Sequence, residues 1–579
     1  MISQRWTLAS SAISSNINKW NALLNMYRLG SFNNLDRKKD ERGRFNQSDQ
    51  SISNASSSVL YNAVETIAPR AMSNFNPEGW FNVSPYRFYD PQTRGVIETP
   101  IESSNYVENK IKRQLDEGDI NNRLLRGAKQ AVQIGFVILK LRWSIEMGTV
   151  YERIQDYNQA SGDTFIRTEP NPGIIYDGPR VDIVHRTDFY PDPKARTLED
   201  TLYVFEEAVL PLPEIRKRAD QEFYEGSAVR EIEKRLSDGS FGGDPSTFND
   251  SSRSGPDNAR AGSQDGFRQD VRLVHYYEND RFVTVATPWG GNADSGIVLN
   301  PKKQDNPYDH NRKPFVMLQI NLDPDRFFPA GVIEPLRDNH AIQTTLLNMS
   351  IDAGIKTLRP MKAILSTLEA DVKDIQNYIP DRIIPIEDDG TMNRPIRDYI
   401  HEFVPAQNGM LTLFPELYTI YRREGEDTSG VTSYLTGQAA TGSNKTARGV
   451  AQLTQNAEIR NSIMTQVLSI GATQLLEMMH SMNQQFGNPN EDQYGVYNWR
   501  VFGNSIADRN QRFQSLQALL PAITAVGGNP VEVLKRLLSD AGIPAIDNIL
   551  PSDGTLEANQ QRDALGQMFA GEQGAQNVQ

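Results

Sequence analysis

The chain of 579 residues has no cysteine, only six histidines and no apolar run of the length that crosses a bilayer. The absence of cysteine excludes disulfides and thiolate metal sites, and it suits assembly in a reducing cytoplasm. A bilayer span needs roughly 18 or more consecutive apolar residues. The N-terminal MISQRWTLASSAISSNINKW also lacks the apolar core of a signal peptide. We therefore expect neither a membrane span nor secretion by that route.

The scarcity of histidine excludes the common zinc-enzyme patterns. The histidines are His185, His275, His310, His340, His401 and His480. No two stand at ligand spacing, and His401-Glu402 is not followed by a second histidine at the zinc-protease position. Asp188 and Asp192 in TDFYPDPKA could bind a hard cation, but the adjacent prolines make turn formation the simpler interpretation. The sequence therefore predicts no metal and no cofactor.

Positive charge is also in deficit, because 60 Lys and Arg face 73 Asp and Glu, for a net charge of -13. A conventional nucleic-acid binder carries a basic face that neutralises phosphates, so this class is disfavoured. The charge suits an ordinary acidic cytoplasmic protein. It equally suits a channel wall along which DNA slides without adhering.

Apolar residues make up 38% of the chain, enough for one large core or several medium ones, and the length suggests about three to four domains. Their spacing predicts an α+β fold. We expect helices at 13–27, 60–71, 103–133 with an interruption near Gly118, and 214–224. We expect strands at 136–143, 181–184, 202–210, 271–277 and 282–287. The segment 237–266 is almost devoid of apolar residues, which predicts a flexible surface insertion.

The most informative segment is a break between two predicted helices, Thr428 to Gly449, which reads TSGVTSYLTGQAATGSNKTARG. Its glycines permit unusual backbone angles and its hydroxyls offer no apolar anchor, so we expect a mobile loop. After it, apolar residues keep i, i+3, i+4, i+7 spacing from Val450 to Met478. This spacing predicts a long helix that reaches about His480 and packs one face on protein.

Upstream, the segment from Phe327 to Pro360 predicts another helix, with a proline near its start and Pro360 at its end. It carries Gln343, Asn348 and Asp352. A monomer core rarely accepts such a polar series, so we expect these side chains at a subunit interface or a wet channel wall. Next come a predicted helix at 368–379, a hairpin that turns at Asp388-Asp389-Gly390, and a helix at 410–423.

The order of these parts resembles the portal proteins (head–tail connectors) of tailed bacteriophages, podovirus-like in type. The resemblance is most specific from Phe327 to about His480. It is carried by the Phe-x-Ala-Gly-Val-Ile-Glu-x-Leu start of the upstream helix with its polar series, by Glu426 to Val431, and by Thr446-Ala447-Arg448-Gly449-Val450-Ala451. A weaker likeness extends back through Ser51 to Thr287.

The resemblance implies a portal fold with an α/β wing, long stem helices, a small helix-plus-hairpin clip and a helical crown. The implied divisions are wing (51–330), stem helix (331–359), clip (360–405), second stem helix (406–427), channel loop (428–449), and long wing helix and crown (450–540). The first fifty residues and the tail after Asp540 match no part of that family, and we expect them to form an N-terminal arm (1–50) and a flexible tail (541–579).

The resemblance also implies function. The protein would be a structural ring of twelve copies, without catalysis of its own, at the portal vertex of the capsid, assembled in the host cytoplasm. It would pass double-stranded DNA non-specifically during packaging and ejection. The implied partners are the terminase large subunit, the major capsid and scaffolding proteins, and tail adaptor proteins; no membrane is implied.

In that family the loop before the long helix faces DNA, which implies DNA-channel roles here for Thr441, Ser443, Asn444, Lys445 and Arg448. Lys445 and Arg448 are the cations nearest the loop, and non-specific phosphate contact is one interpretation. A solvated helix start is the other, although cations there oppose the helix dipole.

Two other functions stay open on the sequence. Gly437 and Gly442, followed by Ser443-Asn444-Lys445-Thr446, superficially resemble a phosphate-binding loop and suggest a nucleotide-binding packaging factor. That loop needs lysine directly after the second glycine, and here two residues intervene. A different ring-forming virion adaptor is the other alternative. An ATPase assay separates the first alternative from a portal, and electron microscopy of the oligomer separates the second.

Overall fold

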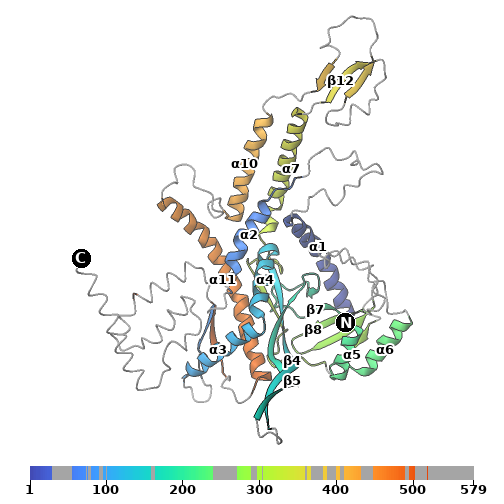
Figure 1. Ribbon diagram of the computed structural model, residues 1–579, viewed down its shortest axis with the longest axis vertical. Helices are drawn as coiled ribbons and strands as arrows, with labels where there is room; N and C mark the ends of the chain where they lie inside the picture. Colours follow the sequence, from blue (N-terminus) through green and yellow to red (C-terminus); the bar gives the residue numbers. More distant parts are fainter. Residues whose placement is uncertain are drawn as a thin grey trace, which may run out of the picture.

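The computed structural model describes residues 1–28, 55–72, 75, 80–89, 96–98, 101–157, 164–238, 270–288, 296–302, 304–358, 361–366, 383–387, 400–403, 410–431, 447–488, 495–501 and 518. Over these ranges the chain mixes helices and sheets, compatible with the predicted α+β class (Figure 1). Almost all of the predicted flexible insertion lies outside the described residues, as do the 368–379 helix, nearly all of the C-terminal helical region and the tail. None of the described helices is long and apolar enough to cross a membrane.

The centre of the body is a three-stranded antiparallel sheet in the order β11–β4–β5. β4 spans Phe136–Tyr157, β5 spans Thr164–Val184 and β11 spans Phe315–Gln319. From Phe136 to Leu139 every β4 side chain is 1% exposed or less, so both faces of the sheet are covered there. The predicted strands at 136–143 and 181–184 are confirmed, but they are only the inner ends of a much longer ribbon. Glycines and prolines in its outer part hide the strand pattern.

Helices α4 (Ile120–Ile134) and α11 (Ala447–Phe486) cover one face of this sheet. A Cβ placed on Gly127 of α4 would lie 3.3 Å from Val137, and one on Gly471 of α11 would lie 2.7 Å from the Met317 carbonyl oxygen. Both helices can approach this closely because their contact residues lack side chains. The predicted long helix is confirmed and continues six residues past His480.

The other face meets α1 (Ile2–Tyr27) and a second sheet. Trp20 of α1 packs edge-on against Phe136, with ring centroids 5.0 Å apart. Phe189 meets Phe315 in the same way at 5.3 Å. The predicted N-terminal helical stripe is therefore confirmed as a core-facing surface.

The second sheet has five strands in the order β10–β9–β8–β7–β6. Its strands are β6 (Phe189–Pro191), β7 (Val204–Pro211), β8 (Asp270–Tyr277), β9 (Phe282–Thr287) and β10 (Ile297–Val298). Two helices, α5 (Leu212–Asp220) and α6 (Gly226–Ser237), pack with β8, β9 and β10 in a smaller apolar cluster of their own. The predictions for β7, β8, β9 and α5 are confirmed; α6 was not predicted.

The remaining helices of the body are α2 (Val59–Met72) and α3 (Ile101–Glu117). Between α3 and α4 the chain bends at Gly118 and Asp119, as predicted. A Cβ on Gly118 would meet the Gln114 carbonyl oxygen at 2.7 Å and the Tyr176 hydroxyl at 2.9 Å, so the bend requires glycine. Two small ladders complete the described body: β1 (Phe81–Pro85) with β15 (Tyr497–Val501), and β2 (Arg87–Tyr89) with β3 (Val96–Glu98).

Two helices, α7 (Ile333–Leu358) and α10 (Met410–Ser429), run side by side away from the body (Figure 1). Both helices were predicted. Beyond them lies a sheet of β12 (Met361–Ser366), β13 (Ile383–Glu387) and β14 (Ile400–Phe403) in the order β13–β12–β14.

The second arm of the predicted hairpin at Asp388-Asp389-Gly390 lies outside the described residues, so the hairpin stays a prediction. β13 pairs in parallel with β12, a strand that was not predicted, and β14 pairs with β12 from the other side. The turn residues themselves lie outside the described ranges. Strand pairing over this separation cannot be read from a local turn signal, because a turn motif reports only on neighbours in sequence.

Candidate functional site

The paired helices α7 and α10 are joined to the body by side-chain amides. Gln343 of α7 is 1% exposed. Its Nε2 donates to Asn339 Oδ1 at 2.6 Å and to the Tyr421 carbonyl oxygen at 3.1 Å, while its Oε1 accepts from the Ser57 hydroxyl at 2.9 Å. One side chain therefore connects α7, α10 and the segment that leads into α2.

Asn348, farther along α7, holds the same segment. Its Oδ1 accepts from the Ala55 N–H at 2.7 Å and its Nδ2 donates to the Ala55 carbonyl at 3.0 Å. The Ser57 N–H donates to Thr344 Oγ1 at 3.2 Å. These bonds give an extended backbone segment the partners that a sheet would otherwise supply, which is a physical reason for polar residues on this helix face.

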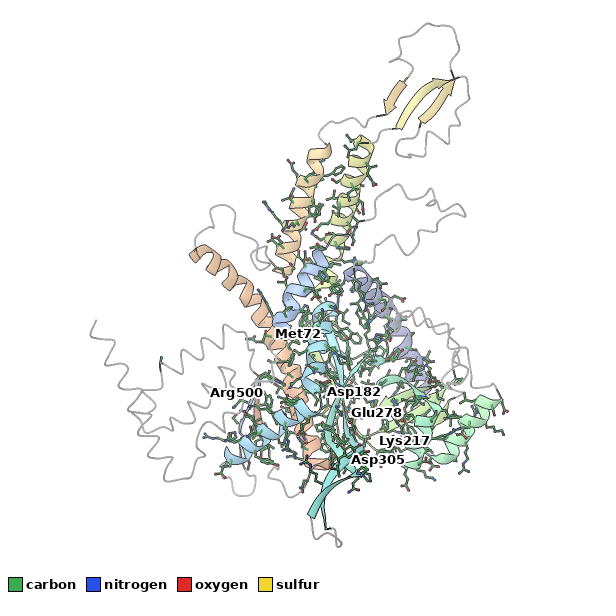
Figure 2. All side chains as sticks on the ribbon, viewed as in Figure 1. Met72, Asp182, Lys217, Glu278, Asp305 and Arg500 are labelled. Carbon is green, nitrogen blue, oxygen red and sulfur yellow. The ribbon has the colours of Figure 1, made fainter. Side chains whose placement is uncertain are left out.

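Gly425 of α10 lies at the same junction. A Cβ there would meet Asn339 Oδ1 at 3.1 Å and Val59 at 3.3 Å, so α10 comes very close to both α7 and α2. Beside it, a groove of about 410 Å³ lies between the three helices, with Asn62, Tyr418 and Arg422 in its wall. Side chains line both helices of the pair along its length (Figure 2).

The sequence reasoning placed Gln343, Asn348 and Asp352 at a subunit interface or a channel wall. The structure places Gln343 and Asn348 on partners in their own chain, and Asp352 at 7% exposure near the outer half of α7. Gln343 is buried within a single chain, a position that the sequence led us to regard as rare for such a residue. The helix periodicity gave no sign of the segment at 55–57 that occupies the polar side of α7.

The predicted mobile loop starts from a fixed point. α10 ends at Ser429, two residues into the predicted loop, and Gly430 follows with a φ of +71° and with its N–H donating to the Glu426 carbonyl at 2.9 Å. This left-handed glycine ends the helix in the usual manner. Val431 follows at 7% exposure, with its N–H on Ser429 Oγ at 3.1 Å. The chain is therefore still anchored in the core at Val431, within the first residues of the predicted loop.

The predicted DNA-channel residues fall mainly beyond that anchor. Thr441, Ser443, Asn444 and Lys445 lie outside the described residues, and Arg448 lies in the first turn of α11, where only the backbone is described. Whether these five side chains lie close together therefore stays a prediction. The structure does place the start of α11 well away from the α7–α10 pair (Figure 1).

A backbone contact at the start of α7 explains part of the Phe-x-Ala-Gly motif. Gly331 passes against Gly135, which ends α4 with φ +105°. A Cβ on Gly135 would lie 2.1 Å from the Pro329 carbonyl oxygen, and one on Gly331 would lie 2.4 Å from the Gln133 carbonyl oxygen. The Val332 N–H donates to the Val132 carbonyl at 3.0 Å. Sequence reasoning missed Gly135, although a glycine directly after a helix is a known C-terminal signal.

The two aspartates weighed as metal ligands have structural partners. Asp192 Oδ1 accepts from the Lys194 N–H at 3.0 Å, which is the turn interpretation, and Asp188 Oδ1 accepts from the Thr187 hydroxyl at 2.8 Å. Burial lowers the pKa of His310 to about 4 and also lowers the pKa of His480. Within the described ranges, no group of three or more His, Asp or Glu side chains could hold a metal ion.

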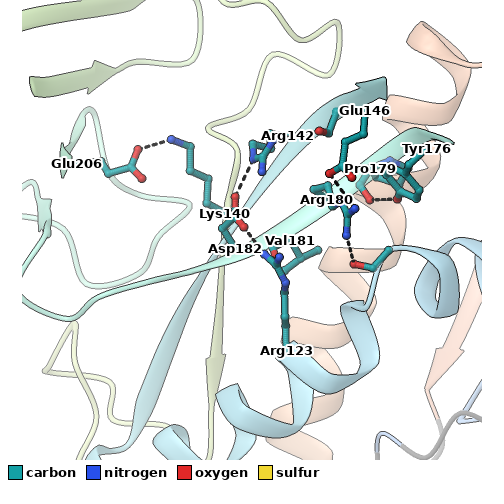
Figure 3. A network of polar contacts seen from close by, with 12 residues as sticks. Arg123, Lys140, Arg142, Glu146, Tyr176, Pro179, Arg180, Val181, Asp182 and Glu206 are labelled. Carbon is teal, nitrogen blue, oxygen red and sulfur yellow. Dashed lines mark hydrogen bonds and ion pairs between the residues drawn. The ribbon is translucent and has the colours of Figure 1, made fainter. Parts of the chain in front are cut away.

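An ionic cluster fixes the direction of the β4–β5 ribbon (Figure 3). Arg123 of α4 and Arg142 of β4 both bind Asp182 of β5, Arg142 through Nε at 2.7 Å. Arg180 donates to Glu146 Oε1 and to the Gly118 carbonyl oxygen, both at 2.8 Å. Burial opposes ionisation of Asp182, but the hydrogen bonds and charges of the two arginines lower its pKa overall.

Comparison with known protein families matches residues 166–493 to the family described as Phage SU10 portal protein. The matched range begins within β5 and continues through β6 to β11, α7, α10 and α11, whereas β4 and the segment at 55–57 that meets α7 lie before it. Comparison with curated proteins found no match. The family match covers more than half of the chain, and it includes the whole segment whose order of motifs resembles portals. The chain therefore belongs to the Phage SU10 portal protein family.

Proposed function

We propose that copies of this chain close into a ring whose central channel passes double-stranded DNA at one vertex of the capsid. The family match over residues 166–493 carries this proposal. The α7–α10 pair supports it, because two antiparallel helices that leave the body together can repeat around an axis as a channel wall. The described part of the pair leaves Met349, Leu413 and Ile420 between 47% and 58% exposed, which suits contact between copies.

In this proposal the chain divides as expected from its sequence. Residues 51–330 form the wing after an N-terminal arm of 1–50, 331–359 and 406–427 the stem helices, 360–405 the clip, 428–449 the channel loop, and 450–540 the long wing helix and crown before a flexible tail at 541–579. Contact of Gln343, Asn348 and Asp352 with neighbouring copies or channel water stays part of the proposal. For the first two, the intramolecular bonds suggest an indirect role, since they set the angle at which α7 and α10 leave the body.

Sedimentation velocity and electron microscopy of the purified chain test the ring. The expected result is a closed oligomer with a central channel, for which we propose twelve copies. A monomer of 65.1 kDa that persists at every concentration would contradict it, because a closed ring repeats one heterologous interface.

We further propose that the loop from about Gly430 to Asn444 projects into the channel and guides DNA loosely, with Lys445 and Arg448 at its base. Its support is the fixed departure point at Val431 and the glycine-rich sequence that follows. Replacing Lys445 and Arg448 by Ala should leave the ring assembled and alter DNA packaging or retention, and shortening the loop should have the larger effect. Normal packaging and retention by loop-shortened rings would refute this assignment.

The proposed partners at the outer end are the terminase large subunit before packaging is complete and tail adaptor proteins afterwards, with capsid and scaffolding proteins around the body. Deleting residues 360–405 should spare folding of the body, since β12, β13 and β14 pair only with one another among the described strands. It should abolish terminase or adaptor capture in pull-downs. Unchanged capture would show that this segment is not the docking module.

The protein belongs to a structural family, and we propose that the terminase motor supplies ATP hydrolysis. A purified ring with no ATPase activity would fit this division of labour. Hydrolysis that is lost on replacing Lys445 would instead favour the nucleotide-binding alternative.

A further inference from the structure

The outer half of the β4–β5 ribbon carries an uncovered apolar face. β4 pairs with β11 only through Lys140, and Trp143 packs against α11, with its ring 5.5 Å from that of Phe486. Beyond Trp143 the two strands stay paired with each other as far as Tyr157 and Thr164. No third described strand joins them there. At about 3.3 Å per residue, this outer part of β4 extends about 45 Å, on the side of the body away from α7 and α10 (Figure 1).

Four exposed apolar side chains of this segment share a face, while Val150 and Ile175 (41% and 65% exposed) lie on the other. Ile145, Met147 and Tyr151 alternate along β4 with even spacing, so they point to the same side of the ribbon. Ile174 is the cross-strand partner of Met147. Their exposed fractions are 59%, 68%, 69% and 57%. Scattered exposed apolar residues are normal, but four on one face of a two-stranded ribbon form a patch.

The ribbon is built to hold that patch in a fixed direction. Its base is tied to α4 and the α3–α4 bend through Asp182 and Arg180 (Figure 3). Arg180 also lies 4.3 Å from the centroid of the Tyr176 ring, and the Tyr176 hydroxyl donates to the Pro179 carbonyl oxygen at 2.5 Å. A two-stranded ribbon alone is marginally stable in water, so an outer part of this length needs a covering partner.

The size of the patch indicates what kind of partner covers it. Four side chains that each expose about 100 Å² give about 400 Å², roughly half of what one side of a stable interface buries. A partner from solution would not stay bound to so small a patch. A molecule already held nearby by other contacts would, because its effective concentration is high. In a ring, an identical copy stands at the same height on either side of every ribbon.

From these observations we propose that the apolar face formed by Ile145, Met147, Tyr151 and Ile174 docks on the adjacent copy of this chain. The ribbon acts as an arm that fixes the spacing between bodies, separately from the α7–α10 contacts. This inference rests on the ring of the proposed function.

Because the chain lacks cysteine, one introduced thiol reports on one position. The probe is a photoreactive maleimide on full-length Met147→Cys. The matched control is Phe223→Cys, since Met147 and Phe223 are 68% and 67% exposed in the single chain. After irradiation of the purified oligomer, we expect at least about fivefold more covalent dimer from the Met147 position, because the ring raises the local concentration of its target. Mass spectrometry should place the link on a second copy.

The same samples, imaged by electron microscopy, distinguish the two levels of the argument. Rings without excess cross-linking at position 147 would overturn the arm and leave the ring standing, as would links found only to capsid protein in assembled particles. Absence of rings would overturn the proposed function itself. As a second variant, Met147→Glu combined with Tyr151→Glu should raise the protein concentration below which rings dissociate. Phe223→Glu should leave that concentration unchanged. Equal behaviour of the two would also overturn the arm.

Discussion

Replacing Gln343 by Met should loosen the junction that orients α7 and α10 while it keeps the volume of the side chain. The substitution removes three hydrogen bonds, to Ser57, Asn339 and Tyr421. The Tyr421 carbonyl keeps a bond from Asn339 Nδ2 at 2.8 Å, so that acceptor stays satisfied. The Ser57 hydroxyl loses its buried acceptor, and Asn339 Oδ1, which is only part-buried, loses the Gln343 donor.

The size of the effect follows from this inventory. Each neutral hydrogen bond contributes about 1 kcal/mol net, and a buried polar group left without a partner costs about 1–3 kcal/mol. With one acceptor still satisfied, we expect a loss of about 2–3 kcal/mol in the free energy of local opening. At 1.4 kcal/mol per factor of ten, amide exchange at the junction should accelerate by about 30- to 150-fold.

Hydrogen exchange with mass spectrometry measures this opening locally. Thermal unfolding of the whole chain is less suitable, because a chain of this size is not expected to unfold in a two-state manner. The peptides to follow cover Ala55 to Leu60 and the last turns of α10. The control is Gln466→Met, an exposed glutamine on α11, which should leave those peptides unchanged. Ser57→Ala should cost less in the Gln343→Met background than alone, because the partner is already gone. Unchanged exchange, or full additivity of the two substitutions, would refute the claim that Gln343 holds the junction.

Three further predictions concern the body. Gly135→Ala should destabilise the start of α7 strongly, by more than about 3 kcal/mol, because a positive φ and a 2.1 Å backbone approach are both forbidden to a Cβ; a thermal-shift series against Gly226→Ala, where a Cβ meets nothing within 4 Å, checks it. Asp182→Asn should weaken protection of β5 at neutral pH; the difference should begin to shrink as pH falls below about 4, the ordinary pKa of an unfolded aspartate, and should vanish only below the lowered folded pKa. Because the folded pKa of Asp182 is lowered, its carboxylate stabilises the fold at pH values above the unfolded pKa, and this stabilisation is lost as pH falls through the folded pKa. Hydrogen exchange measured over a pH series checks this. Trp20→Ala should lower the free energy of unfolding by about 3–5 kcal/mol, since Trp20 is 4% exposed between two aromatic rings. Limited proteolysis should then release α1. An α1 that stays resistant to protease would contradict this packing.

Local pattern was sufficient for most helices and for the inner strands. The apolar spacing from Val450 to Met478 predicts α11 because a helix repeats every 3.6 residues whatever it packs against. The interruption near Gly118 was visible for a similar local reason. The order of motifs from Phe327 to His480 also pointed to the family that the comparison then matched.

Tertiary structure alone decided what the polar and glycine residues do. Gln343 and Asn348 read as interface residues because the sequence does not reveal that Ala55 and Ser57, almost 300 positions away, lie against them. Gly135 and Gly331 acquire their role only where two backbones meet. The outer β4–β5 ribbon and the parallel pairing of β13 with β12 were likewise hidden. Periodicity is a property of one segment, whereas hydrogen-bond partners, close backbone approaches and strand pairing are properties of two, and only the folded chain brings the second segment into place.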